Sequence, residues 1–210
     1  MQLLGVSKVA ALACLAGLVG APLQAADVRV LVTDDRGAPM ADAVVEVRGL
    51  PAGGDPGSAA LDQRELAFVP RVLAVRRGGS VRFLNGDRVN HHVYSFSPAR
   101  RFDLRLSKGD GGTSLRFDAT GTVVVGCNIH DWMLGYIRVV ESPHFAVTGG
   151  DGVASFELDV PSAEGATVSA WHPRFAEADG VVSRPLGSDV TIATTKPLKP
   201  DPWPSSPGYR

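Results

Sequence analysis

The segment "GCNIHDWM", residues 126–133, holds three side chains that can bind a soft metal ion. Cys127, His130 and Met133 follow one another in Cys-x2-His-x2-Met spacing, so a short loop can turn all three donor atoms toward one point. Thiolate and thioether sulfurs favour copper, and imidazole suits copper and zinc alike. The segment indicates a metal site, and a buried cysteine that merely packs as a small hydrophobe is the competing interpretation.

A further imidazole is offered by "NHHVYSFS" at residues 90–97. His91 and His92 are adjacent, and neighbours on a strand project to opposite faces, so one of them at most can be a ligand. Two imidazoles, a thiolate and a weakly bound thioether form the trigonal site with a long axial bond that suits copper in electron transfer. Zinc is the main alternative ion because thiolate and imidazole suit it too, but Met133 is an unusual ligand for a structural zinc site.

The remaining two histidines stand apart from these segments. His144 follows a proline, and His172 lies in "AWHP". Neither has a soft donor nearby, so we expect a surface residue and a sandwich-edge residue rather than ligands.

The elements that hold the cysteine are predicted to be strands. Val123, Val125 and Cys127 share one face by the two-residue period, which predicts a buried sulfur. A strand resumes at Tyr136 to Val140, so the loop between is held at both ends.

Short runs of this kind fill the chain, and no amphipathic helix is evident. Turn formers such as "DDRGAP", "RRGG", "SKGDGG" and "GGDG" separate the runs. This spacing predicts an all-β protein of antiparallel sandwiches with Greek-key connections. The predicted strands are 28–32, 44–47, 68–75, 81–84, 92–96, 102–106, 123–127 and 136–140.

The pairing of "NGDRVNHHVYSFS" with "GTVVVGCNIHDWM" resembles the cupredoxins, most closely the plastocyanin-like and amicyanin-like proteins, including methylamine-utilisation proteins. The resemblance spans roughly residues 62–141. It implies one mononuclear type 1 copper ion held by His91, Cys127, His130 and Met133. His92 stands where an asparagine usually links the two ligand loops, and it is the alternative ligand if the strand register differs.

This resemblance implies a periplasmic one-electron carrier that is not itself an enzyme and that exchanges electrons with redox partner proteins, a dehydrogenase or a cytochrome. It places His130 at the edge through which the electron leaves, with Asp131 and Trp132 nearby. Two other functions stay open: a copper-binding protein for copper handling or resistance, and a structural β-protein in which Cys127 is incidental.

The flanking segments have a resemblance of their own. Residues 28–49 and 145–175 resemble the two halves of a transthyretin-like or carboxypeptidase-regulatory-like β-sandwich. This predicts a cupredoxin domain at 59–142 inserted between sandwich segments 26–58 and 143–195. Residues 196–210, within a stretch that has five prolines, are expected to form an extended tail. The alternative is one enlarged sandwich.

Residues 1–25 are predicted to be a signal peptide. Lys8 precedes an apolar run at 9–20, and Leu23-Gln24-Ala25 is a small-residue cleavage site. The run has about twelve residues, against the roughly twenty that span a bilayer, so we expect export to the periplasm and no membrane span after cleavage. Cys14 would be removed, which leaves Cys127 without a partner in an oxidising compartment.

The formal net charge of the chain is -1. This near balance does not suggest a nucleic-acid partner. The sequence leaves the oligomeric state open.

Overall fold

The computed structural model describes residues 25–109, 111–159 and 165–203. These residues form sixteen β-strands and one 3-10 turn, Ala178–Gly180, which confirms the predicted all-β class. Apart from Ala25, the predicted signal peptide lies outside the described residues, as do residues 204–210 of the predicted tail. Within the described part of the chain, no helix has the length and apolar character needed to cross a membrane.

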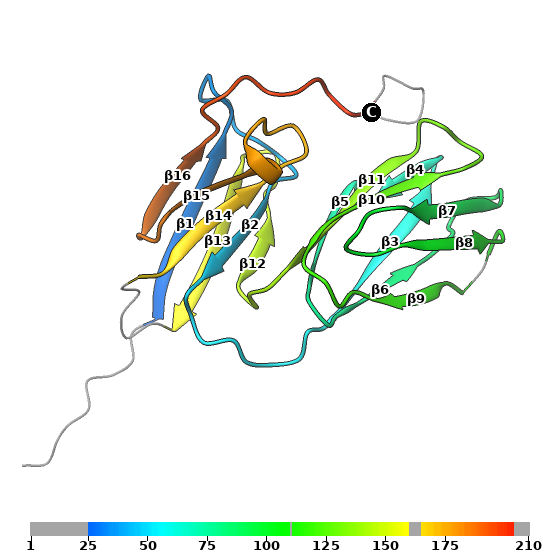
Figure 1. Cartoon of the computed structure of the whole chain (residues 1–210), viewed down its shortest axis with the longest axis horizontal. Helices are drawn as coiled ribbons and strands as arrows, with labels where there is room; N and C mark the ends of the chain where they lie inside the picture. Colours follow the sequence, from blue (N-terminus) through cyan, green and yellow to red (C-terminus); the bar gives the residue numbers. More distant parts are fainter. Residues whose placement is uncertain (1–24, 110, 160–164, 204–210) are drawn as a thin grey trace, which may run out of the picture.

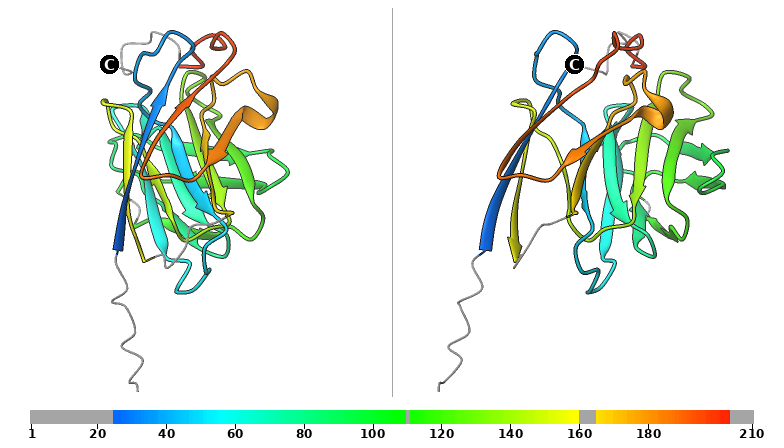
Figure 2. Two further views of the ribbon diagram at one scale, coloured as in Figure 1. Left: turned by 90° about the vertical axis from the view of Figure 1, so that its left-hand side faces the viewer. Right: turned by 60° about the vertical axis from the view of Figure 1, so that its left-hand side comes forward.

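Two β-sandwiches lie side by side along the long axis of the molecule (Figure 1). The first, which we call the outer sandwich, has a three-stranded sheet in the order β13-β1-β16 and a four-stranded sheet in the order β12-β2-β14-β15. Figure 2 shows the sheet of β1 on the side away from the second sandwich. The strands of the outer sandwich are β1 (Ala25–Thr33), β2 (Val44–Arg48), β12 (Phe145–Val147), β13 (Val153–Asp159), β14 (Thr167–Trp171), β15 (Val181–Pro185) and β16 (Asp189–Ala193).

The second, which we call the central sandwich, is built from residues 58–140. Its sheets have the orders β5-β11-β10-β7-β8 and β4-β3-β6-β9. The strands are β3 (Ser58–Arg64), β4 (Ala67–Val69), β5 (Val72–Arg76), β6 (Ser80–Phe83), β7 (His91–Ser95), β8 (Phe102–Leu106), β9 (Thr113–Arg116), β10 (Gly121–Cys127) and β11 (Leu134–Val140).

Strand β10 has the predicted alternation of faces. Val123, Val125 and Cys127 are buried in the core between the two sheets of the central sandwich, whereas Val124 is 42% exposed. Because successive side chains on a strand point to opposite faces, the sulfur of Cys127 is placed inside the sandwich by the strand itself. The predicted burial of Cys127 is confirmed.

Besides the core of each sandwich, a further apolar cluster lies between the two sandwiches. Trp171 belongs to it, although its neighbours Val168 and Ala170 lie in the core of the outer sandwich. The two-residue period of β14 explains this division, since Trp171 is on the opposite face of the strand. Trp203, from the segment after β16, packs into the same cluster, so that segment crosses from the outer to the central sandwich along the upper edge of Figure 1.

Several strand predictions needed correction. The single strand expected at 68–75 is two strands, β4 and β5, separated at Pro70, whose ring nitrogen has no hydrogen for a ladder. Strands β3, β9, β12, β15 and β16 were not predicted, whereas β13 and β14 lie in the segment expected to form half of the flanking sandwich. The joined arrangement of two sandwiches is as expected, and the domain bounds 26–58, 59–142 and 143–195 stay a prediction.

Candidate metal centre

Two neighbouring strands bring the candidate ligands together. Strands β7 and β10 run antiparallel, with Cys127 opposite Val93. The peptide N–H of Asn128 donates to the carbonyl of His92 at 2.9 Å, which extends the pairing past the end of β10. His91, at the start of β7, therefore lies next to Cys127, at the end of β10.

The donor atoms lie close enough to share one ion. Cys127 Sγ is 3.7 Å from His91 Nδ1 and 3.5 Å from His130 Nδ1. All three atoms lie within 4.8 Å of one another. Cys127 and His91 are buried, and His130 is half-buried. The structure thus brings together the donor atoms of three of the four candidate ligands, His91, Cys127 and His130.

These distances fit a first-row metal ion. Metal–sulfur and metal–nitrogen bonds of about 2.3 and 2.0–2.1 Å, at angles between tetrahedral and trigonal, separate sulfur from nitrogen by about 3.6–3.8 Å. The observed separations of 3.5 and 3.7 Å are close to that range. One thiolate and two imidazoles are also the donor types that copper and zinc prefer.

Met133 is placed by a tight turn of the same loop. Its peptide N–H donates to the carbonyl of His130 at 2.9 Å, and β11 begins at the next residue, Leu134. The side chain is 2% exposed and lies in the same core cluster as Cys127. Its thioether is therefore a candidate fourth donor inside the sandwich.

His92 points away from the sulfur. Asn128 Nδ2 approaches His92 Nδ1 at 3.4 Å, and His92 Nε2 lies 2.7 Å from Asp103 Oδ1. With Nδ1 accepting, Nε2–H donates to the carboxylate. The structure brings His91 rather than His92 to the sulfur, and the ring of His92 links the two ligand loops instead.

Asp87 is a site residue that the sequence did not indicate. Its Oδ2 lies 2.8 Å from His91 Nε2, and the carboxylate also accepts the peptide N–H groups of Glu65 and Leu66 at 2.7 and 3.1 Å. A carboxylate on Nε2 fixes the tautomer of the ring and leaves the Nδ1 lone pair free for a metal. Asp87 stands in an irregular loop, where no periodicity reveals which way a side chain points.

Hydrogen bonds stabilise the charged form of Cys127. Burial raises the pKa of this thiol, but hydrogen bonds from His91, from the peptide N–H groups of His92 and Ile129 and from His130 outweigh burial and lower the pKa to about 6. Burial lowers the pKa of His91, and contacts with Cys127 and Asp87 outweigh it and raise the pKa. Because a thiolate is the metal-binding form of cysteine, the lowered pKa of Cys127 favours a metal ion at the sulfur.

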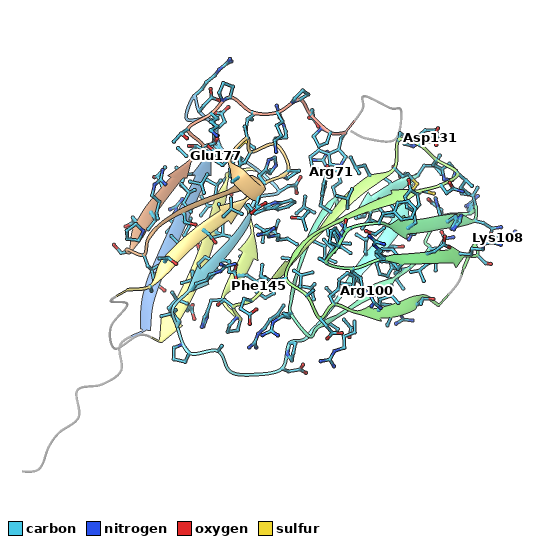
Figure 3. The ribbon with its side chains drawn as sticks, in the orientation of Figure 1. Arg71, Arg100, Lys108, Asp131, Phe145 and Glu177 are labelled. Atoms are coloured by element: carbon cyan, nitrogen blue, oxygen red, sulfur yellow. The ribbon has the colours of Figure 1, made fainter. Side chains whose placement is uncertain are left out.

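An open hollow of about 770 Å³ lies beside the sulfur. Cys127 and Met133 form part of its wall, and Trp132 packs its ring 5.5 Å from that of His130. Asp131, labelled in Figure 3, is exposed on the loop at the upper edge of the central sandwich. The site is therefore shielded by the core on one side and close to solvent on the other.

The two other histidines lie outside this centre. His144 is half-buried. His172 is 3% exposed and directly follows the end of β14.

No family model matches the chain, and no curated protein matches it. Among solved structures, the chain is similar to amicyanin from Paracoccus versutus, at 18% identity over 44% of this chain and 86% of that chain, with a TM-score of 0.36. It is also similar to a purple cupredoxin from Nitrosopumilus maritimus, at 22% identity over 39% of this chain and 99% of that chain, with a TM-score of 0.35.

A third solved structure that is similar to this chain is the Cu-containing nitrite reductase from Thermus scotoductus. The identity is 22% and the TM-score 0.38, over 52% of this chain and 28% of that chain. The chain thus spans under a third of the reductase. These similarities concern part of the chain, and the function has to be argued from the side chains of the site.

Proposed function

We propose that the protein is a one-electron carrier that holds a single type 1 copper ion through His91, Cys127, His130 and Met133. The observation that carries the proposal is the position of Cys127 Sγ, 3.7 and 3.5 Å from the Nδ1 atoms of two histidines. Bound copper supplies the change between Cu(II) and Cu(I).

The protein residues favour fast electron transfer by keeping the ligands still. Cys127 is fixed by the pairing of β10 with β7, and His91 is fixed by Asp87. Valines of β10 exclude water from the sulfur, and the half-buried His130 provides the edge nearest to solvent. A ligand set that cannot rearrange suits an ion that changes its charge.

We propose a carrier rather than an enzyme because of the number of side-chain donors. A catalytic metal centre keeps a position open for water or substrate. If Met133 completes the set of His91, Cys127 and His130, side chains take all four positions of the proposed site and leave none open.

The proposed setting is the periplasm, supported by the signal-peptide pattern of residues 1–25. The proposed partners are redox proteins, a dehydrogenase or a cytochrome. Exposed apolar side chains near the ligands, Ile129 at 54% and Phe96 at 77% exposure, suit contact with another protein.

A copper-handling role is the second candidate function. The hollow lined by Cys127 and Met133 is open to solvent, so a copper ion has a path to its ligands. A carrier has to retain its ion, whereas a handling protein has to release it.

Copper retention and electrode cycling separate the two functions. The copper-loaded full chain is incubated with a Cu(I) chelator, and a second sample is cycled at an electrode. We expect a reversible one-electron wave and copper that stays bound over many cycles. Rapid loss of copper to the chelator without a reversible wave would favour the handling role.

A further inference from the structure

A second hollow lies at the junction of the two sandwiches, away from the candidate metal centre. Its volume is about 480 Å³, within the range of small-molecule sites. Thr122, Tyr136 and Arg138 of the central sandwich form one wall, and Arg48, Trp171 and His172 of the outer sandwich form the other. A ligand in this hollow would touch both sandwiches.

The guanidinium group of Arg138 lies on this wall and forms part of its possible hydrogen bonds within the protein. Its Nη1 donates to Thr122 Oγ1 at 2.8 Å, and its Cζ lies 5.5 Å from the centre of the Trp171 ring. Among the described residues, no carboxylate forms an ion pair with Arg138. Since a guanidinium has five N–H donors, most of them are left for an acceptor from outside the protein.

Burial already acts against the charge of Arg138. Its pKa is lowered by burial, and the charge of Arg48 lowers it further, while Glu46 and Asp179 act in the opposite direction. Arginine nevertheless stays protonated in proteins. An anion beside Arg138 would therefore offset a desolvation cost that the folded chain already carries.

The charges around the hollow favour an anion. Arg48, Arg138 and Lys199 line it, against the single carboxylate of Asp179. Glu46 offsets the charge of Arg48, since its Oε2 lies 2.7 Å from that guanidinium, and its Oε1 accepts two peptide N–H groups at 2.8 Å. The remaining excess comes from Arg138 and Lys199 against Asp179. A concave site with excess positive charge concentrates anions.

His172, on the same wall, has a neutral ring. Its Nδ1 accepts the peptide N–H of Arg174 at 3.2 Å. Burial lowers the pKa of His172 to about 4, so the ring is neutral at pH 7 and carries its hydrogen on Nε2. The guanidinium of Arg138 and the hydroxyl of Thr122, 2.8 Å apart, are groups that recognise oxygen acceptors.

We propose that this junction hollow binds a small ligand with an oxyanion group, a carboxylate or a phosphate, and that Arg138 is its main anchor. The planar fork of a guanidinium matches two oxygens of either group. The site is separate from the copper ligands and goes beyond the proposed carrier function.

Calorimetric titration of the full chain tests the proposal. Sodium phosphate and sodium malonate serve as the two probes, and sodium chloride at matched ionic strength is the blank. We expect saturable binding of at least one probe above the chloride blank, and the tighter probe identifies the group. Binding of neither probe above the blank would overturn the proposal.

Variants locate the site. Arg138→Gln should weaken binding of the tighter probe by about tenfold or more, the usual effect of losing a charge-assisted hydrogen bond. Arg116→Gln is the matched control, because this exposed arginine pairs with Asp118 at 2.7 Å outside the hollow, and it should change affinity less than about twofold. Equal effects of the two variants would contradict the proposal.

A measurement on the unaltered chain covers the case that Arg138→Gln does not fold. Amide and indole NMR signals of the reduced protein are followed during the titration. Shifts confined to Thr122, Arg138, Trp171 and Gly180 are expected. Shifts spread over the surface, as from general screening, would overturn the assignment.

Discussion

The carboxylate of Asp87 determines how His91 can act as a ligand. It lies 2.8 Å from Nε2 and is itself held by two peptide N–H groups. A carboxylate behind an imidazole makes the ring a stronger electron donor, and such donation stabilises the more highly charged ion. In the proposed copper site, Asp87 should therefore favour Cu(II) over Cu(I).

Replacement of Asp87 by asparagine tests this role. We expect Asp87→Asn to weaken Cu(II) binding about tenfold relative to Cu(I), which raises the reduction potential by about 60 mV in voltammetry. The matched control is Asp103→Asn, since Asp103 contacts Nε2 of His92, which is not a proposed ligand. Equal shifts in both variants would contradict a specific role of Asp87.

The sequence could predict the candidate ligands but not their support. Cys127, His130 and Met133 lie within seven positions, and the strand period allowed only one of two adjacent histidines to join them. The role of Asp87 could not be predicted, because the position of its carboxylate depends on the path of an irregular loop. The contact of His92 with Asp103 joins two strands, β7 and β8, and such pairings cannot be read from one segment alone.

At the scale of elements, the segment after β14 buries a histidine. His172 follows Trp171 and is 3% exposed, and burial lowers its pKa to about 4. In an unfolded chain the pKa of histidine is about 6.5, so folding favours the neutral form. The resulting stability is fully present above pH 6.5 and is lost as the pH falls toward 4.

The pH dependence of unfolding tests this burial. From pH 7 to pH 5, the free energy of unfolding of the unaltered protein should fall by about 2 kcal/mol more than that of His172→Gln. Urea unfolding at both values, in buffers without phosphate or carboxylate, gives the comparison. Identical pH dependence in the two proteins would show that His172 titrates normally in the folded state.

Strand prediction succeeded in segments where apolar and polar residues alternate, and it missed strands such as β3 that depend on pairing with their neighbours. The predicted strand at 102–106 has the observed bounds of β8. Strand β3, "SAALDQR", has no β-branched or aromatic residue, yet it pairs with β4 and β6 and buries Leu61. Tertiary pairing overrides weak local preference in such segments.

At the scale of the whole molecule, Trp203 fastens the segment after β16 to the central sandwich. Its Nε1–H donates to the carbonyl of Leu134 at 3.0 Å, and Arg71 lies 4.5 Å over its ring. Figure 3 shows Arg71 at the upper side of the junction. Because Leu134 follows Met133 directly, this contact also holds one end of the candidate metal loop.

Removal of the Trp203 ring should loosen the two sandwiches. Trp203→Ala is expected to lower the free energy of unfolding by about 3 kcal/mol, as for other buried aromatic residues. Trp203→Phe keeps most of the apolar contact and should cost about 1 kcal/mol for the lost hydrogen bond. Guanidinium unfolding measures both, and a loss below about 0.5 kcal/mol for Trp203→Ala would contradict a fastening role.

The joining of two sandwiches could be predicted, whereas their mutual packing could not. The flanking segments have the turn and strand pattern of a sandwich, but the cluster between the two sandwiches brings together residues far apart in the chain, such as Val44, Val140 and Trp203. Trp171 could be predicted as buried, but its place between the sandwiches follows from buried partners on four separate segments, β2, β5, β11 and the segment after β16.

Optical and paramagnetic spectra of the copper-loaded chain test the central claim most directly, with Cys127→Ala as the control. A Cu(II)–thiolate bond should give an intense visible absorption and the signal of a single type 1 copper, both absent from the variant. A copper-loaded protein without the intense absorption, or a variant with the same spectrum, would contradict a copper site built on Cys127.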